Sequence, residues 1–230
     1  MRVNAYIDGF NLFYGALKAK VNPRLDIEIQ KALKADKRKL RWLDINKLIL
    51  EFVKGKDVDI QKINFYTAEV KPHYNGDISP IYQQEYLKAL STLPNVVIHK
   101  GRYDMHPKKL PKYPLRNPIE FETVLNSEEK RSDVNFATHL VYDACCDDFD
   151  LAVLVTNDSD LLEPIKIIKQ MGKNFLILCP HSGINNDFLI NFDTVCLRKI
   201  SSKHVRNSQF DDILYDELGH IVASRPEKWK

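Results

Sequence analysis

The stretch LAVLVTNDSD, residues 151–160, decides the fold of this chain. Its apolar half, Leu151 to Val155, consists of strand-forming residues, and the apolar spacing of a helix follows from Leu161. A buried strand that leads into a helix is typical of a parallel α/β sheet, in which ligands bind at the carboxyl ends of the strands. Asp158 and Asp160 lie at that end, and carboxylates this close repel each other unless a cation or proton lies between them. Since Asp is also a favoured helix N-cap, a purely structural role for either aspartate stays open.

Strands and helices alternate along most of the chain. Apolar runs predict further strands over residues 3–7, 59–70, 95–102, 173–179 and 194–200. Helical spacing predicts helices over residues 11–20, 42–54, 80–93, 161–171 and 184–191, and over 133–144 with Ser132 as N-cap. Because helices join successive strands, the sheet is expected to be parallel with right-handed crossovers. The predicted fold is α/β, a three-layer α/β/α domain around a mostly parallel sheet of about five to six strands.

Two basic segments interrupt this pattern. Residues 21–41 are polar and indicate a partly helical insertion. Residues 103–118 hold four prolines among lysines and tyrosines, which excludes a helix or a central strand. Such a segment suits a single strand of nucleic acid, although an ordinary Pro-rich loop explains it equally well. An edge strand is expected over residues 119–125. We expect residues 1–202 to form one domain and residues 203–230 to be an extension that packs on it.

The composition is that of an ordinary globular protein and argues against several classes. The 230 residues carry a net charge of +3, too small to indicate a polyanion partner by itself. The four cysteines form no CxxC pair, so neither a disulfide framework nor a zinc site is expected. No N-terminal signal or transmembrane-length apolar run is visible, so we expect a cytoplasmic protein with no membrane contact. The Gly-rich signatures of dinucleotide and P-loop binding are absent.

Acidic residues follow three separate elements that a parallel sheet can bring to one edge. Asp8 ends the first strand, and Asn11 lies three residues further on. Asp133 lies in the first turn of a predicted helix, on its inward face. If the first and fourth strands are neighbours, these residues meet the two aspartates that follow residue 155. Carboxylates crowded in a dry cleft call for hard divalent cations such as Mg²⁺ or Mn²⁺, which can activate water for attack on a phosphodiester.

Three motifs together resemble one known family. They are YIDGFNLFYG (residues 6–15), EEKRSDVNFATHLVYDA (residues 128–144) and TNDSDLLEPIKII (residues 156–168), in that order. On these motifs the chain resembles the bacterial branch of the NYN-domain proteins, which belong to the PIN-like nuclease superfamily. The resemblance implies a parallel sheet between helices, an acidic pocket for Mg²⁺ or Mn²⁺, and ribonuclease activity. Carried over to this sequence, the metal-binding and catalytic acids fall on Asp8, Asp133, Asp158 and Asp160, with Asn11 as a polar helper.

The same motifs suggest roles for further residues. Lys130 is expected to contact a phosphate or the transition state, and Asn157 and Arg131 are expected to contact the substrate. Arg131 departs from the family pattern, because relatives usually have Gly before Ser-Asp, and this change affects the lip of the pocket. Asp143 matches a recurrent family acid whose role the sequence does not define.

The resulting hypothesis is a metal-dependent ribonuclease whose partner is RNA. In it Asp158 is a direct metal ligand, while Asp160 reaches the metal through water and also caps the following helix. One alternative is a nucleic-acid-binding module that keeps the pocket but does not cleave. Another is a metal-dependent phosphohydrolase of a small phosphate ester, which the single acid after the first strand disfavours. The sequence leaves the oligomeric state open and is compatible with a homo-oligomer.

Overall fold

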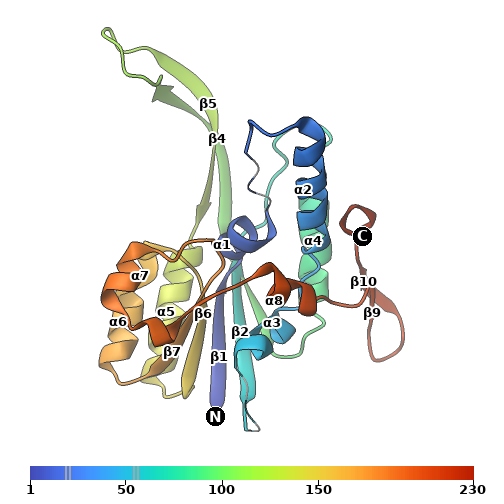
Figure 1. The fold of residues 1–230 in the computed structure, drawn as a ribbon, viewed down its shortest axis with the longest axis vertical. Coiled ribbons are helices and arrows are strands. Elements are labelled where there is room, and N and C mark those ends of the chain that lie inside the picture. The colour runs from blue at the N-terminus through green and yellow to red at the C-terminus, as the bar shows by residue number, and fades with distance from the viewer. Residues whose placement is uncertain (19, 21, 54, 56) are drawn as a thin grey trace.

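A parallel β-sheet forms the centre of the molecule (Figure 1). The structure is a computed structural model that describes residues 1–18, 20, 22–53, 55 and 57–230. Within these residues the sheet has six strands, all paired in parallel, in the order β3-β2-β1-β6-β7-β8. The strands are β1 (Arg2–Asp8), β2 (Asp59–Thr67), β3 (Val96–Lys100), β6 (Leu151–Val155), β7 (Asn174–Cys179) and β8 (Leu197–Lys199). The predicted parallel α/β sheet is confirmed.

Helices cover both faces of this sheet and complete the three predicted layers (Figure 1). One face packs against α5 (Ser132–Cys145), α6 (Leu162–Gln170) and α7 (Asn186–Asn191). The other side carries α1 (Gly9–Leu12), its π-helical continuation η1 (Phe13–Leu17), α2 (Ile27–Lys39), α3 (Ile45–Phe52), α4 (Ser79–Leu90) and α8 (Ser202–Asn207). Short 3₁₀ turns complete the set: η2 (Ser159–Leu161), η3 (Thr194–Cys196) and η4 (Glu227–Trp229).

The central strand β1 shows why the sheet is buried on both sides. Val3, Ala5 and Ile7 belong to the apolar cluster on the α3 and α4 side, whereas Tyr6 belongs to the cluster on the α5 side. Successive side chains of a strand point to opposite faces, so a strand covered by helices on both faces is apolar throughout. All four side chains are fully buried. This burial fixes the position at which β1 ends, and therefore the position of Asp8.

The order of the strands defines where a ligand site is expected. β1 lies between β2 and β6, so the chain leaves β1 toward one side of the sheet and later returns to its other side. Ile7 lies opposite Val155 in the register of β1 and β6. The two strands therefore end side by side, and the crevice outside their carboxyl ends is the topological switch point of the sheet.

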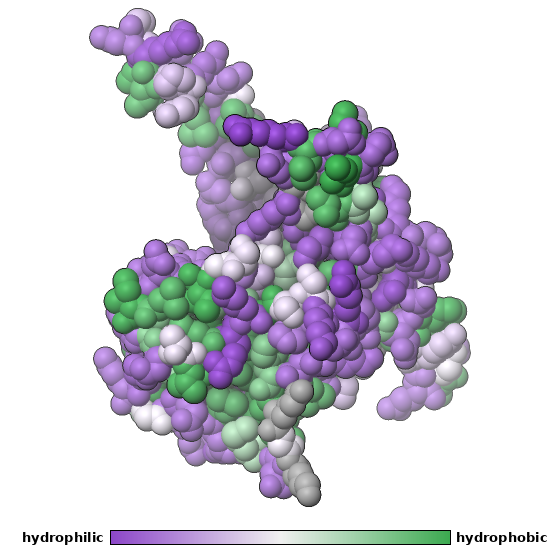
Figure 2. Space-filling model, in the orientation of Figure 1, coloured by the Kyte–Doolittle hydropathy of each residue, from purple (hydrophilic) through white to green (hydrophobic). Residues whose placement is uncertain are grey.

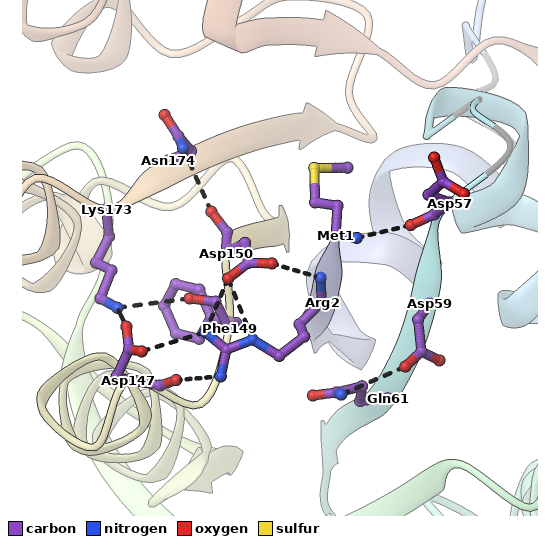
Figure 3. A network of polar contacts seen from close by, with 10 residues as sticks. All are labelled: Met1, Arg2, Asp57, Asp59, Gln61, Asp147, Phe149, Asp150, Lys173 and Asn174. Atoms are coloured by element: carbon purple, nitrogen blue, oxygen red, sulfur yellow. Dashed lines mark hydrogen bonds and ion pairs between the residues drawn. The ribbon is translucent and has the colours of Figure 1, made fainter.

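The opposite edge of the sheet carries an ion-pair network (Figure 3). The Arg2 guanidinium contacts Asp150 at 2.8 Å and Asp147 at 3.2 Å. Lys173 forms a further ion pair with Asp147. The acids between residues 143 and 160 therefore lie at two ends of the sheet. Asp147 and Asp150 bind Arg2 at the amino ends of β1 and β6, whereas Asp158 and Asp160 lie at the carboxyl ends.

A long hairpin projects from the body of the molecule (Figures 1 and 2). It consists of β4 (Arg102–Pro111) and β5 (Phe121–Lys130), paired antiparallel. Residues 103–118 are therefore neither a helix nor a central strand, as expected, but the alternative of a Pro-rich loop fails for the first half, which is a strand. The edge strand predicted over residues 119–125 extends to Lys130. Both strands of a two-stranded ladder are edges, so Pro is tolerated in them. Apolar side chains are exposed near the tip of the hairpin, among them Tyr113, Leu115, Ile119 and Phe121.

Some boundaries differ from the prediction. The helix predicted from Trp42 begins at Ile45, because Asp44 caps it by accepting the Lys47 N–H at 3.0 Å. The helix expected over residues 11–20 begins at Gly9 and ends at Leu17. Helix α2 confirms that the insertion over residues 21–41 is partly helical. Ala19, Val21 and Lys54, which belong to these three predicted segments, lie outside the described residues.

The last segment packs on the α3 and α4 side of the sheet. It contains β9 (Ile213–Tyr215) and β10 (Ile221–Ser224), which pair antiparallel. Trp229 is buried, with its ring 6.3 Å from Trp42 and 5.6 Å from Tyr82. The Ser224 N–H donates to Glu85 at 2.9 Å. Within the described part of the chain, no helix has the length and apolarity needed to cross a bilayer.

Candidate active site

Asp8 is the most buried acid at the switch point. It is the last residue of β1, is 7 % exposed, and accepts the Asn11 N–H at 2.8 Å, which caps α1. Burial raises the pKa of Asp8 to about 7, and the hydrogen bond from Asn11 opposes this shift. The negative charges of Asp133, Asp158 and Glu129 raise the pKa further. Asp8 therefore lies within electrostatic reach of acids from three other segments.

Asp133 joins the same group from the first turn of α5. Its side chain is partly buried, and burial is the main reason why its pKa rises to about 6. The charges of Asp158, Glu129 and Asp160 also raise the pKa of Asp133. Asp8, Asp133 and Asp158 thus lie within electrostatic reach of one another, and Asp160 lies within reach of Asp133. We refer to Asp8, Asp133, Asp158, Asp160 and Glu129 as the acidic cluster.

Asp158 and Asp160 divide their tasks differently from the prediction. Asp158 is the N-cap of η2 and accepts the Asp160 N–H at 3.0 Å. The prediction that Asp160 caps the following helix is therefore wrong, because that helical segment begins one residue after Asp158. Asp160 is exposed in the first turn of η2. The structural reason for an acid at position 158 is clear, whereas capping gives no reason for one at position 160.

Two asparagines connect the loops that carry the acids. The Asn11 side-chain oxygen accepts the Asn157 N–H at 3.0 Å, which ties α1 to the loop after β6. Asn157 in turn accepts the Asn185 N–H at 2.9 Å and donates to the Gly183 carbonyl at 3.1 Å. Asn157, predicted to contact substrate, therefore has its amide engaged with the loop before α7. Asn11 holds the acidic loops together.

Glu129 is the member of the cluster that the sequence did not reveal. It lies near the end of β5, and its carboxylate accepts hydrogen bonds from the Ser132 hydroxyl and, at 3.2 Å, from the Ser132 N–H. Ser132 was predicted to be the N-cap of α5, but that position belongs to Arg131. A Cβ on Gly101 would lie 2.7 Å from a Glu129 carboxylate oxygen, so the lack of a side chain there leaves room for Glu129. Adjacent acids in a polar strand carry no signal that separates Glu129 from its neighbours.

The two predicted cationic substrate contacts lie at the base of the hairpin. Lys130 forms ion pairs with Glu128 at 3.5 Å and Asp104 at 3.8 Å, so its ammonium faces acids of the hairpin. Arg131 is exposed and has a φ of 82°, in the left-handed region that Gly adopts most easily. Within the described residues, neither side chain forms a hydrogen bond or ion pair with the acidic cluster, although both residues directly precede Ser132 and Asp133 in the chain.

Asp143 lies away from this cluster. It is 3 % exposed, accepts the Tyr6 hydroxyl at 2.7 Å, and lies 3.7 Å from the Lys62 ammonium. A buried carboxylate with both a hydrogen-bond donor and a cation is satisfied within the fold. Asp143 therefore fastens α5 to β1 and β2.

Comparison with known proteins places this arrangement in a family. The family profile of the NYN domain matches residues 2–196. The chain belongs to the NYN domain family. The match includes the segments that carry all five members of the acidic cluster, and the suspected family is confirmed. A nuclease-type hydrolase is thereby supported for this NYN domain at the level of the superfamily.

Two individual proteins are similar to the chain. A curated protein of Pseudomonas putida (strain DSM 28022 / S16), named 6-hydroxy-3-succinoylpyridine 3-monooxygenase HspA, is 25 % identical over 259 aligned residues, covering 100 % of this chain and 75 % of that protein. A crystal structure of a protein of unknown function, VPA0982 from Vibrio parahaemolyticus RIMD 2210633, has a TM-score of 0.47 and 12 % identity. That comparison covers 91 % of this chain and 96 % of the other.

The chemistry of the acidic cluster of this NYN domain fits a hard divalent cation. Carboxylate oxygens are the ligands that Mg²⁺ and Mn²⁺ prefer, and a cation would relieve the repulsion that raises the pKa of Asp8 and Asp133. As the side chains lie, however, the described residues contain no group of three or more His, Cys, Asp or Glu with the spacing of a metal site. One oxygen each of Asp8 and Asp158 accepts a capping N–H. A metal would use the remaining oxygens.

A cavity adjoins the acidic cluster. It has a volume of about 360 Å³ and is bordered by α1, η1, the end of β2, α4 and the start of β4. Gly9 and Phe10 line it, directly after Asp8 in the chain. A Cβ on Gly9 would lie 2.7 Å from the Tyr66 carbonyl, so this position needs Gly for its close approach to β2. The acidic cluster and the cavity thus share one turn of the backbone.

Proposed function

We propose that the chain hydrolyses phosphodiester bonds in RNA with the help of Mg²⁺ or Mn²⁺. The observation that supports the proposal is the crowding of negative charge at the switch point of the sheet, where Asp158 and Glu129 help to raise the pKa values of Asp8 and Asp133 to about 7 and about 6. Membership of the NYN domain family supports the nuclease assignment.

Each part of the cluster has a separate task in this proposal. Asp8, Asp133 and Asp158 would hold the cation, and Asp160, which is exposed, would reach it through water. A bound Mg²⁺ or Mn²⁺ supplies an activated water and stabilises the charge that develops on the phosphate oxygens. Asn11 keeps Asp8 and the loop of Asp158 at a fixed separation through its bond to Asn157. Such positioning preserves the in-line geometry that the reaction requires.

Basic residues outside the cluster would hold the RNA backbone. The hairpin carries Lys108, Lys109, Lys112 and Arg116. Lys108 also lies 3.4 Å from Glu128 of β5, and Lys112 lies 4.0 Å from Glu120, just before β5. Phosphate contacts of this kind give affinity without sequence preference and weaken as salt rises. We therefore expect binding to many single-stranded RNAs.

The test is cleavage of end-labelled single-stranded and structured RNA with Mg²⁺, with Mn²⁺ and with EDTA. Wild-type protein should cleave only with a metal. Asp158→Asn should lower the rate at least about 100-fold, since loss of an outer-shell partner alone typically costs roughly 10–100-fold. Asp59→Asn is the matched control, because Asp59 begins β2 at the opposite edge of the sheet and, within the described residues, its side chain hydrogen-bonds only to Gln61. Equal cleavage by wild type and Asp158→Asn would identify a contaminating nuclease and end the proposal.

The cavity supports a second candidate function. The name of the Pseudomonas relative describes oxygenation of a small aromatic acid, and a volume of about 360 Å³ lined by aromatic residues suits a ligand of that size. Oxygen uptake that depends on 6-hydroxy-3-succinoylpyridine and an added two-electron reductant would support this function. RNA cleavage that Asp158→Asn abolishes, without such oxygen uptake, would favour the nuclease.

A further inference from the structure

The cavity beside the acidic cluster is basic. Lys18, Arg41 and Lys71 line it, and the described residues that surround it include no Asp or Glu. The charge of the cavity is therefore opposite to that of the cluster, although Gly9 and Phe10 belong to the turn that carries Asp8. A ligand that spans the cavity and the acidic cluster would need an anionic group in the cavity. At the acidic cluster it would need a group that can bind beside a metal cation.

Arg41 has no anionic partner within the described part of the protein. Its side chain forms none of the hydrogen bonds or ion pairs found there, and its Nε is buried without an acceptor. Its guanidinium lies over the Phe13 ring, 5.0 Å from the centroid. A partly buried guanidinium normally binds a carboxylate or a phosphate, often through two hydrogen bonds. Unpaired guanidinium N–H donors at the wall of a cavity indicate an anionic ligand.

Aromatic rings form the other wall of the cavity. The Phe10 ring is nearly parallel to that of Tyr14, at 6.5 Å and 21°, and to that of Tyr103, at 6.3 Å and 25°. These rings come from α1, η1 and β4, so the hairpin contributes to the wall. Tyr14 is 46 % exposed, and the Lys18 ammonium lies over its ring, 4.4 Å from the centroid. Exposed ring faces beside cations are the usual platform for an unstacked base.

We propose that this cavity binds one nucleotide unit of the RNA strand, with its base against the Phe10, Tyr14 and Tyr103 rings and its phosphate at Arg41. The inference rests on the proposed function, because it places the next nucleotide of the same substrate beside the cleavage site. A nucleotide is the ligand class that combines a planar ring with an adjacent anion and that continues as a chain toward the metal-binding acids. The ligand chemistry could also come from a free mononucleotide, and the experiment separates the two sources.

The test measures binding in EDTA, so that neither metal nor cleavage is required. Calorimetric titrations use AMP, UMP, a six-nucleotide RNA and benzoate, with wild type, Arg41→Met and Tyr14→Ser. Arg24→Met is the control for loss of one positive charge, because Arg24 is exposed and does not line the cavity. Thermal unfolding checks that each variant is folded. If Arg41→Met does not fold, Tyr14→Ser still tests the site, because Tyr14 is an exposed residue.

The expected result is binding of the RNA and, more weakly, of the mononucleotides. Arg41→Met and Tyr14→Ser should each weaken the binding of the RNA and of the mononucleotides by about tenfold or more. Arg24→Met should leave mononucleotide binding unchanged. If a mononucleotide binds more tightly than the RNA, the ligand is not a unit of an RNA strand. If benzoate binds more tightly than AMP, the ligand of the cavity is not a nucleotide. RNA binding that is insensitive to both cavity variants would overturn the site. If Asp158→Asn still cleaves while Arg41→Met loses binding, the nuclease proposal fails and the cavity stands.

Discussion

The side-chain oxygen of Asn11 accepts the backbone N–H of Asn157 at 3.0 Å, and this bond joins the carboxyl ends of β1 and β6. The two residues are 146 positions apart in the chain. Each is close to an acid of the cluster, since the Asp8 carboxylate accepts the Asn11 N–H and Asn157 precedes Asp158. The relative position of two proposed metal ligands therefore depends on one amide.

Replacing this amide should separate positioning from general stability. Asn11→Ala leaves the Asn157 N–H without an acceptor, which should lower the free energy of unfolding by about 1–3 kcal/mol and reduce RNA cleavage. Asn95→Ala is the control, because its amide donates to the Ile60 carbonyl at 3.0 Å near the other edge of the sheet. Asn95→Ala should lower the free energy of unfolding by a similar amount, but each folded molecule should cleave RNA at the wild-type rate. Denaturant unfolding and initial rates measure both, and equal loss of activity in the two variants would contradict the positioning role.

The acidic cluster should make the metal-free protein less stable as pH rises. Asp8 has an ordinary pKa of 3.8 and a folded-state pKa of about 7, so the folded chain binds the proton more tightly than the unfolded chain. The free energy of unfolding therefore falls between about pH 4 and pH 7, and the shift of Asp133 adds to the same slope. In EDTA the melting temperature should be higher at pH 5 than at pH 8. For a chain of this size, each kcal/mol lost from the free energy of unfolding lowers the melting temperature by about 2–4 °C.

Asp8→Asn is the variant that checks this slope. It removes the titrating group and should raise the melting temperature at both pH values, but more at pH 8 than at pH 5, where Asp8 of the folded wild type is still mostly protonated. Mn²⁺ should stabilise the wild type at pH 8 and the variant much less, because a ligand that binds the folded state raises its stability. A melting temperature of the wild type that rises from pH 5 to pH 8 in EDTA would contradict the proposed crowding of acids.

Tyr6→Phe tests the structural role of Asp143. The substitution removes the hydroxyl that donates to the buried carboxylate at 2.7 Å and leaves Lys62 as the nearest cation. We expect a loss of about 1–3 kcal/mol in the free energy of unfolding, since a buried acceptor loses its partner. Cleavage per folded molecule should not change. A large loss of activity without loss of stability would instead make Asp143 part of the reaction.

Arg131 allows backbone strain and substrate contact to be measured separately. Its φ of 82° is costly for any residue except Gly, so Arg131→Gly should stabilise the protein by about 1 kcal/mol. Arg131→Ala keeps the strain and should not be stabilising. If the guanidinium contacts RNA, both variants should weaken RNA binding equally in a filter-binding assay. Binding equal to wild type in both would remove Arg131 from the substrate contacts.

The arrangement of the sheet could be predicted because its signals are local. Runs such as Leu151 to Val155 are apolar throughout, and the burial of both sheet faces leaves no other place for them. The acids that end β1 and β6 follow from the same reasoning, since parallel strands end at one edge. Helical spacing placed Asp133 on the inward face of α5, and the resemblance to NYN-domain proteins gave it a metal-binding role.

Other features depended on contacts that a sequence does not display. The hairpin was missed because Pro107 and Pro111 argue against a strand, while a two-stranded ladder tolerates them at its edges. Glu129 was missed because nothing local separates it from the acid beside it, and only its bond to Ser132 fixes it in the cluster. The role of Arg41 depends on the cavity that η1 and α4 border.

The central claim is that the acidic cluster holds a divalent cation, and the most direct measurement is a crystal soaked in Mn²⁺ and recorded at the manganese absorption edge. The account predicts an anomalous peak between Asp8, Asp133 and Asp158, with ligand oxygens about 2.0–2.2 Å from the metal. A parallel soak of Asp158→Asn should show a weaker peak or none. A fully occupied peak elsewhere, with these three carboxylates unmoved and without metal between them, would contradict the account.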